Sequence, residues 1–254
     1  MIAITRPVSD SLASCELTHL ERQPIDVDRA RAQHRAYEEA LEDAGCAIVR
    51  VDAAPELPDA VFVEDTAVVL PEVAIVTRPG APSRRLEVPP IAAVLGRYRE
   101  LVSVEPPATL DGGDVLVLGR HVYVGRSRRT SDGGIAQLRR ILMRYGYEVV
   151  AVEVAGCLHL KSAATAIADD RLLVNPAWVA VDAFAGAHLL SIDPDESQAA
   201  NALRAGEMLV YPSAFPRTRD TLVRAGHRVR EVDVSELAKA EGAVTCCSVM
   251  FDAA

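Results

Sequence analysis

The feature that most constrains the fold is a recurring unit of two short apolar runs separated by a tight polar turn. It occurs four times, in TAVVLPEVAIVTRP from Thr66, DVLVLGRHVYVGRS from Asp114, TAIADDRLLVNP from Thr165 and ANALRAGEMLVYP from Ala200. The turns PE, GRH, DDR and AGE lie between runs rich in Val, Leu and Ile, which is the pattern of β-hairpins. The chain therefore predicts four antiparallel hairpins.

A helix and a further strand are expected after most of these hairpins. In GIAQLRRILMRYGYEVVAVEV, apolar residues recur at helical spacing, at Ile135, Leu138, Ile141 and Leu142. The same order is predicted in IAAVLGRYRELVSVEP, in TRDTLVRAGHRVREVDV and, near the N-terminus, in RARAQHRAYEEALEDAGCAIVRVD. Glycines that fit the ends of these helices are Gly45, Gly146 and Gly226.

Such units cannot bury their apolar faces alone, and repeats of roughly 35 to 50 residues favour a closed array such as a propeller. We expect the fifth unit to combine the chain ends, with one strand from MIAITRP and another from VTCCSVMF. The prediction is an α/β fold in which residues 1–254 form a single domain. A doubly wound parallel sheet is the rival, but four hairpins favour antiparallel pairing. LDGGDVL also lacks the spacing of either phosphate-binding glycine motif.

Composition excludes several classes of protein. The 254 residues are 50% hydrophobic, enough for a substantial core. A net charge of −9 disfavours a nucleic-acid partner and suits a small cationic ligand. The N-terminus does not resemble a signal peptide, and no apolar run approaches about 18 residues, so no membrane association is expected. Five scattered cysteines are typical of reduced thiols. We therefore expect a soluble cytoplasmic protein.

Two of the cysteines, Cys246 and Cys247, are adjacent on the predicted C-terminal strand. Side chains of neighbouring strand residues point to opposite faces, so one thiol can face a central site while the other packs. Two buried structural thiols are the alternative. A vicinal disulfide is strained and disfavoured in a reducing compartment.

His159 is the histidine best placed for chemistry. It lies in GCLHLKSAAT, where an alternating strand would turn it away from Leu158 and Leu160 and toward either a pocket or the core. The other histidines are expected at the surface or with satisfied hydrogen bonds. A Cys with a His elsewhere in the chain is by itself a weak signal for a nucleophile.

Carboxylates and arginines supply further candidates. PDAVFVEDTAVV and TLDGGDVL place acidic residues in apolar surroundings, at Asp59, Glu64, Asp65, Asp111 and Asp114. Burying them requires a cation, a metal or hydrogen-bond donors, and a cationic substrate would serve. The loops TRPGAPSRR and GRSRRT carry arginines, which suit carboxylate recognition. Each of these residues, taken singly, also fits a solvated turn or strand end.

Together these segments resemble the dimethylarginine dimethylaminohydrolase family of the guanidino-modifying pentein superfamily. PDAVFVEDTAVV, ITRPGAPSRR, ATLDGGDVLVLGR, VGRSRRT, LHLKS and VTCCSV follow the family's motifs in the family's order, from before residue 60 to the C-terminus. The resemblance implies a pentein fold, a five-bladed propeller of ββαβ units whose last blade is closed by the N- and C-terminal strands. It implies hydrolysis of Nω-methylated L-arginine to citrulline and dimethylamine or methylamine through a covalent S-alkylthiouronium.

The resemblance also implies roles for single residues. Cys246 would be the nucleophile, His159 the general acid and base, and Asp111, where some relatives have Glu, the third member of the triad. The implied substrate-binding residues are Asp59, Glu64 and Asp65 for the guanidinium, Arg84 and Arg129 for the amino-acid end, and Leu17 and Ala240 for backbone contacts. No cofactor or required metal is expected, although zinc captured at Cys246 would inhibit.

Other functions share this pattern. An arginine deiminase would carry an acidic residue two positions after the catalytic His, where this chain has Lys161, and would be much longer. A short chain also disfavours an amidinotransferase. A non-catalytic guanidino-binding module would not need the thiol of Cys246. A monomer and a homodimer are both compatible with the sequence.

Overall fold

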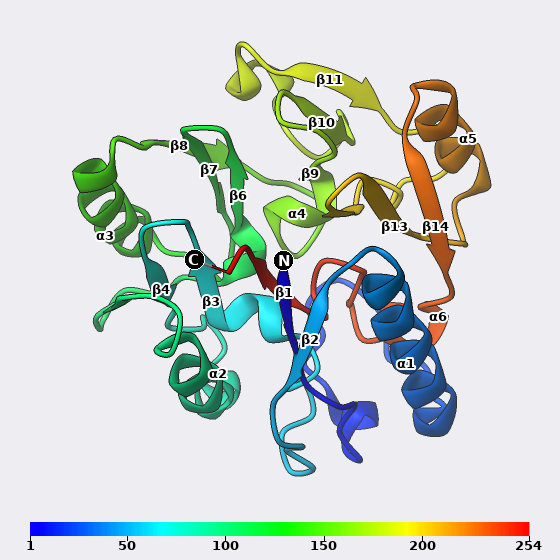
Figure 1. Ribbon diagram of the computed structural model, residues 1–254, viewed down its shortest axis with the longest axis horizontal. Helices are drawn as coiled ribbons and strands as arrows, with labels where there is room; N and C mark the ends of the chain where they lie inside the picture. The colour runs from blue at the N-terminus through cyan, green and yellow to red at the C-terminus, as the bar shows by residue number, and fades with distance from the viewer. Residues whose placement is uncertain (254) are drawn as a thin grey trace.

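Five three-stranded sheets surround a common centre in the computed structural model, which describes residues 1–253 (Figure 1). In every sheet the middle strand pairs antiparallel with one neighbour and parallel with the other. The predicted α/β ring of five blades is confirmed.

Four of the sheets each begin with a predicted hairpin. They are β3 (Ala67–Val69), β4 (Ala74–Val76) and β5 (Leu101–Ser103); β6 (Val115–Leu118), β7 (His121–Arg126) and β8 (Glu148–Glu153); β9 (Ala164–Ala166), β10 (Arg171–Val174) and β11 (His188–Ser191); and β12 (Leu203–Ala205), β13 (Met208–Pro212) and β14 (Arg228–Val232). The first two strands of each set are the antiparallel pair, as their polar turns predict.

The fifth sheet joins the two ends of the chain. β1 (Ile2–Thr5) lies between β15 (Val249–Phe251) and β2 (Ala47–Arg50). β1 is antiparallel to β15, with Ile2 opposite Phe251, and parallel to β2. The predicted closure is confirmed, and it holds the C-terminal segment in place although the segment is near a chain end.

The longer helices lie outside the ring of sheets, whereas the short helix α4 (Leu160–Ala163) lies near its centre (Figure 1). The longer ones are α1 (Val27–Asp43), α2 (Val88–Leu95), α3 (Asp132–Leu142) and α5 (Pro216–Arg224), and the short ones are α4 (Leu160–Ala163) and α6 (Ser235–Ala238). The predicted terminal glycines adopt positive φ, at +87° for Gly45, +75° for Gly146 and +91° for Gly226. In the blade of β9 to β11, a 3-10 helix at Val181–Phe184 takes the place of the long helix.

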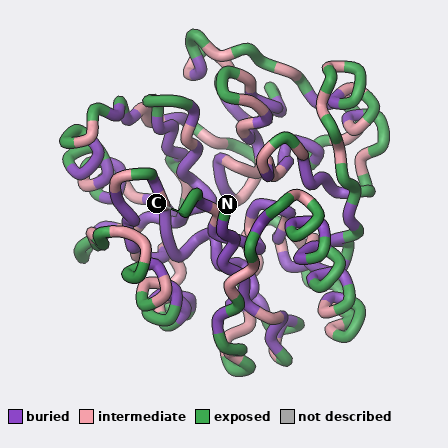
Figure 2. Tube along the Cα trace, in the orientation of Figure 1, coloured by how far each residue is buried: buried purple, intermediate pink, exposed green. Residues whose placement is uncertain are grey.

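The buried residues gather toward the centre and the exposed ones toward the periphery (Figure 2). The inner strands contact one another around the ring, β15 with β3, β6 with β9 and β9 with β12. Connections that enter the centre carry short 3-10 helices at Val63–Thr66 and Gly112–Asp114. Among residues 1–253, no helix is long and apolar enough to cross a membrane.

Candidate active site

A narrow cavity of about 20 Å³, here called the central cavity, gathers most of the predicted site residues. Its lining includes Asp59, Asp65, Arg84, Arg129, His159, Ala240 and Cys246. Glu16, Phe62, Leu158 and Glu241 complete the wall. These residues come from loops and turns far apart in the chain, so the folding of the ring is what brings them together.

The remaining predicted residues lie elsewhere. Asp111 is fully buried behind His159. Leu17 packs against the core beside α1, and the neighbouring Glu16 is the residue that lines the central cavity. Glu64 does not point into this cavity, because its carboxylate faces a different pocket.

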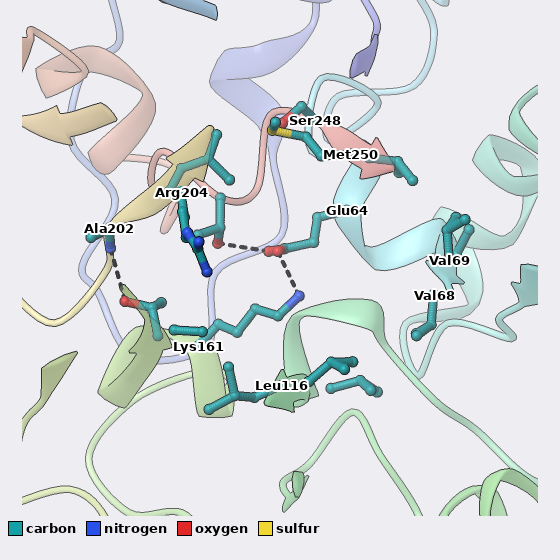
Figure 3. Close-up of a pocket in the computed structure, with 17 residues that line it drawn as sticks. Glu64, Val68, Val69, Leu116, Lys161, Ala202, Arg204, Ser248 and Met250 are labelled. Atoms are coloured by element: carbon teal, nitrogen blue, oxygen red, sulfur yellow. Dashed lines mark hydrogen bonds and ion pairs between the residues drawn. The ribbon is translucent and has the colours of Figure 1, made fainter. Parts of the chain in front are cut away.

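That second pocket, here called the strand pocket, has a volume of about 260 Å³ and is lined by the inner strands β3, β6, β9, β12 and β15. Glu64 lies in it beside Lys161 (Figure 3). The Lys161 ammonium donates to Glu64 at 2.8 Å, and the Thr245 hydroxyl donates to it at 2.9 Å. Glu64 is therefore engaged within the protein, and its contact with a guanidinium stays a prediction.

The cysteine pair lies in a turn that precedes β15, so the prediction of a strand there is wrong. The two thiols nevertheless point to different surroundings. Cys246 lines the central cavity, and its sulfur accepts a hydrogen bond from the Ala243 amide at 3.3 Å. Cys247 is fully buried in the core cluster that includes residues of α1. Turn geometry, and not strand alternation, separates the pair.

His159 immediately precedes α4, and the expected strand is absent at this position. Its Nε2 lies 3.1 Å from Asp111 Oδ2, and its Nδ1 lies 3.8 Å from Asp65 Oδ1. Leu160 packs in the core, whereas Leu158 lines the same cavity as His159, so the prediction that His159 faces away from both leucines is wrong for Leu158.

The charge of His159 follows from its neighbours. Burial alone would lower its pKa, but Asp65, Asp114 and Asp111 outweigh burial and raise the pKa to about 9. The side chain is therefore an imidazolium at neutral pH, poised to donate a proton.

Asp65 is held from several sides. Its Oδ2 accepts from Arg84 at 2.5 Å, and its Oδ1 accepts from the Gly113 amide at 2.9 Å. Burial would raise its pKa, but the nearby His159 and Arg84 outweigh burial and lower it, so Asp65 is a carboxylate. A Cβ at Gly113 would lie 2.6 Å from His159 Nδ1, so only glycine lets the backbone approach the imidazole so closely.

The two predicted arginines differ. Arg84 is almost fully buried, and besides Asp65 it donates to Glu87 at 2.8 Å and to the Phe62 carbonyl at 2.9 Å. Arg129 is also buried, but its Nη1 has no hydrogen-bond partner among residues 1–253. Buried polar atoms are nearly always paired, so Arg129 is the arginine with a donor available to a ligand.

Sequence reasoning missed the residues that position the turn of Cys246. The Asn201 side chain donates to the Thr245 hydroxyl at 2.9 Å and accepts from the Thr245 amide at 3.1 Å. The Glu64 amide donates to the Cys246 carbonyl at 3.1 Å. Asn201 lies in the otherwise apolar run AANAL. An amide side chain in such a run was the only sign in the sequence that this residue has a structural role.

Asp65, Asp111 and His159 offer ligand atoms within 4.8 Å of one another. A metal ion bound there would require the proton of His159 to leave, and the pKa of about 9 opposes that step at neutral pH. The cluster is therefore better matched to an ion-paired imidazolium than to a metal.

Known proteins of similar sequence cover nearly the whole chain. The sequence profile of the family described as N,N dimethylarginine dimethylhydrolase, eukaryotic, matches residues 16–182. N(G),N(G)-dimethylarginine dimethylaminohydrolase of Streptomyces coelicolor is 42% identical over 248 residues, which are 97% of this chain and 95% of the relative.

Solved structures share the fold. A mutant DDAH from Pseudomonas aeruginosa, with serine in place of one cysteine and in complex with citrulline, superposes with a TM-score of 0.91 at 34% identity over 98% of each chain. The product-bound N-terminal domain of ArgZ, a cyanobacterial arginine dihydrolase, superposes with a TM-score of 0.87 at 19% identity, covering 98% of this chain and 96% of that one. The second likeness shows the fold alone. The predicted pentein fold is confirmed.

Proposed function

The chain belongs to the dimethylarginine dimethylaminohydrolase family, and from that premise we propose that it hydrolyses Nω-methylated L-arginine to citrulline and dimethylamine or methylamine. One observation carries the proposal: an imidazolium, His159, is held by Asp111 and Asp65 in the same narrow cavity as the thiol of Cys246. A nucleophile, a proton donor and a carboxylate for a cation are the three groups that this reaction needs.

The cavity suits both ends of such a substrate. Asp65 and Asp59 supply negative charge for the cationic parts of a methylarginine. Nη1 of Arg129, which lies 4.0 Å from Asp111 Oδ2 and has no hydrogen-bond partner among residues 1–253, supplies a donor for the substrate's carboxylate. Arg84 acts indirectly in this proposal, by holding Asp65 at 2.5 Å. Ala240 and the segment beside Leu17 would contact the substrate through the backbone.

Substrate binding would also activate the nucleophile. Burial raises the pKa of the Cys246 thiol, and the carboxylates of Glu64 and Asp65 raise it further. A bound guanidinium adds a positive charge beside the sulfur, which lowers that pKa and favours the thiolate. The thiol would therefore ionise when the substrate is present.

The first half of the reaction forms the covalent intermediate. The thiolate bonds to the guanidinium carbon, and the imidazolium of His159 donates its proton to the methylated nitrogen as the carbon–nitrogen bond breaks. A neutral amine leaves, and the S-alkylthiouronium remains on Cys246. Asp65 and Asp111 stabilise the positive charge throughout.

The second half releases citrulline. His159, now neutral, takes a proton from a water molecule, and the resulting hydroxide bonds to the thiouronium carbon. The carbon–sulfur bond then breaks, and the hydroxyl proton of the adduct passes to the departing sulfur as the carbonyl of citrulline forms. This restores the thiol and leaves His159 protonated for the next cycle. One water is consumed for each citrulline formed.

A direct assay tests this function. The protein is incubated with asymmetric dimethylarginine, monomethylarginine or arginine, and citrulline is measured, with Cys246→Ser as the blank. Citrulline is expected from the methylated substrates and not from arginine. Turnover of arginine alone would instead establish a deiminase, and no turnover of any substrate would refute hydrolysis.

The remaining expectations belong to the same proposal. Residues 1–254 are taken to act as one domain in the cytoplasm, without a cofactor, and the described cysteines are all free thiols. Zinc bound by Cys246 and His159 would inhibit, because it would occupy both reacting groups.

A further inference from the structure

A separate pocket adjoins the central cavity. This side pocket has a volume of about 220 Å³, and Leu158 and Glu241 line both it and the central cavity. Ala243 also lines the side pocket, and its amide donates to Cys246 Sγ at 3.3 Å. The side pocket therefore lies directly behind the wall next to the nucleophile.

The chemistry of the side pocket suits a small organic cation. Trp178, the only tryptophan of the chain, lines it together with Leu20 and Leu158. The side pocket has one carboxylate, that of Glu241, and no Lys or Arg among the described residues that line it. A pocket that combines an indole with a carboxylate suits alkylated ammonium ions, through cation–π attraction and charge pairing.

The Glu241 carboxylate retains capacity for such a ligand. Its Oε1 accepts from the amides of His19 and Leu20, at 2.5 Å and 2.7 Å. The Thr18 amide lies 3.0 Å from both oxygens, and it is the only donor to Oε2 among the described residues. A carboxylate oxygen can accept two hydrogen bonds, so Oε2 has room for an ammonium proton.

The order of the two half-reactions gives the side pocket a purpose, because the amine is released in the central cavity beside the carbon that water then attacks. The hydrolytic water cannot reach the thiouronium carbon until the amine has left that space. The amine leaves neutral and then takes a proton from water, because an aliphatic amine resembles the lysine side chain, whose pKa is about 10.4.

We propose that the side pocket is a binding site for the alkylammonium product, with the methyl groups against Trp178 and the ammonium beside Glu241. The amine moves there past Leu158 and vacates the central cavity for water. The inference rests on the proposed hydrolysis for its biological ligand, while the site itself is testable without turnover.

Intrinsic fluorescence tests the site directly, because Trp178 is the only tryptophan. Dimethylammonium chloride is titrated into the protein at constant ionic strength. A saturable change is expected with a Kd of about 1 mM or weaker, since a ligand of three heavy atoms cannot bind tightly. Ammonium chloride, which lacks methyl groups, and propan-2-ol, which lacks charge, should each bind at least about 5-fold more weakly.

Matched variants locate the binding. Glu241→Gln should raise the Kd of dimethylammonium about 5- to 10-fold, whereas Glu207→Gln, an exposed carboxylate outside the pocket, should leave it unchanged. No saturable change in the wild type, an equal response to propan-2-ol, or an unaltered Kd in Glu241→Gln would each overturn the proposal.

Inhibition by the product gives a second measurement. Added dimethylammonium should inhibit citrulline formation, and Trp178→Leu should weaken that inhibition about 5-fold, while Trp178→Phe, which keeps an aromatic face, weakens it less. Equal inhibition of all three proteins would exclude Trp178 from the site. A positive fluorescence titration without any citrulline formation would retain the site and refute only the proposed function.

Discussion

The central cavity and the strand pocket meet at two pairs of adjacent residues, yet they are built differently. Asp65 and Cys246 line the central cavity, while their neighbours Glu64 and Thr245 line the strand pocket. The central cavity is about 20 Å³ and surrounded by charged groups, whereas the strand pocket is about 260 Å³ and mostly aliphatic.

The difference shows how a buried nucleophile can be surrounded by carboxylates. Each carboxylate has a fixed cationic or donor partner: Asp65 has Arg84 and His159, and Glu64 has Lys161. Buried charge is tolerated only when paired in this way. In the proposed mechanism the chemistry takes place in the central cavity, which Cys246 and His159 line, while the strand pocket holds the ion pair of Glu64 and Lys161.

The largest expected effect separates the two adjacent thiols. Cys246→Ser should lower kcat by at least about 10⁴-fold, because the nucleophile of the central cavity is lost. Cys247→Ser should retain activity within about 3-fold and lose about 1 kcal/mol of stability, since its sulfur only packs in the core. Steady-state citrulline assays and urea unfolding measure the two quantities. Loss of activity in Cys247→Ser alone would reverse the assignment.

His159 tests the electrostatics of the central cavity. His159→Gln should lower kcat about 10²- to 10⁴-fold, because no proton reaches the leaving amine. The folded-state pKa of about 9 lies above the ordinary 6.5, so the charged imidazole stabilises the fold fully below about pH 6.5. That stabilisation disappears as the pH rises through about 9.

The size of this stability change is on the order of 3 kcal/mol between pH 6.5 and pH 9. Urea unfolding of the wild type at both pH values measures it, and His159→Gln provides the control because it lacks the titrating group. Equal pH dependence in both proteins would show that the imidazole is not charged by its carboxylate neighbours.

The smallest expected effect comes from the strand pocket. Lys161→Met removes the cation beside Glu64, and the unpaired carboxylate then raises the pKa of Cys246 further. We expect kcat/KM at pH 7 to fall about 10-fold, with the deficit shrinking as the pH rises. The double variant Lys161→Met with Glu64→Gln should recover most of the loss. If the double variant does not recover kcat/KM, the effect of Lys161 does not depend on the charge of Glu64.

Local patterns in the sequence predicted the blades well. Alternating apolar runs and polar turns identified the four hairpins, and Gly45, Gly146 and Gly226 marked helix ends because positive φ is a local property. The closure of β1 on β15 was also predictable, since the four hairpins left two unpaired strands at the chain ends. The 3-10 helix at Val181–Phe184 was not, because its segment lacks clear helical spacing.

The sequence predicted which residues line the site better than it predicted how those residues are arranged. The motifs identified Asp59, Asp65, Arg129, His159 and Cys246, all of which line one cavity. They did not show that Glu64 faces the strand pocket, or that the donors of Arg84 are engaged within the protein. They also did not show that Asn201 holds the turn before Cys246. Each of these facts depends on contacts between residues far apart in the chain.

By itself, the sequence determined the repeating unit, the closure of the ring and a set of candidate site residues, because periodicity, turn residues and motifs are local. Only the tertiary structure decided which member of each adjacent pair faces the central cavity. A 3-10 helix at Glu64 and Asp65 and a turn at Thr245 and Cys246 set those directions, and both are held by partners from other blades. The charge of His159 was decided in the same way, since its pKa depends on carboxylates that only the folded ring brings within reach.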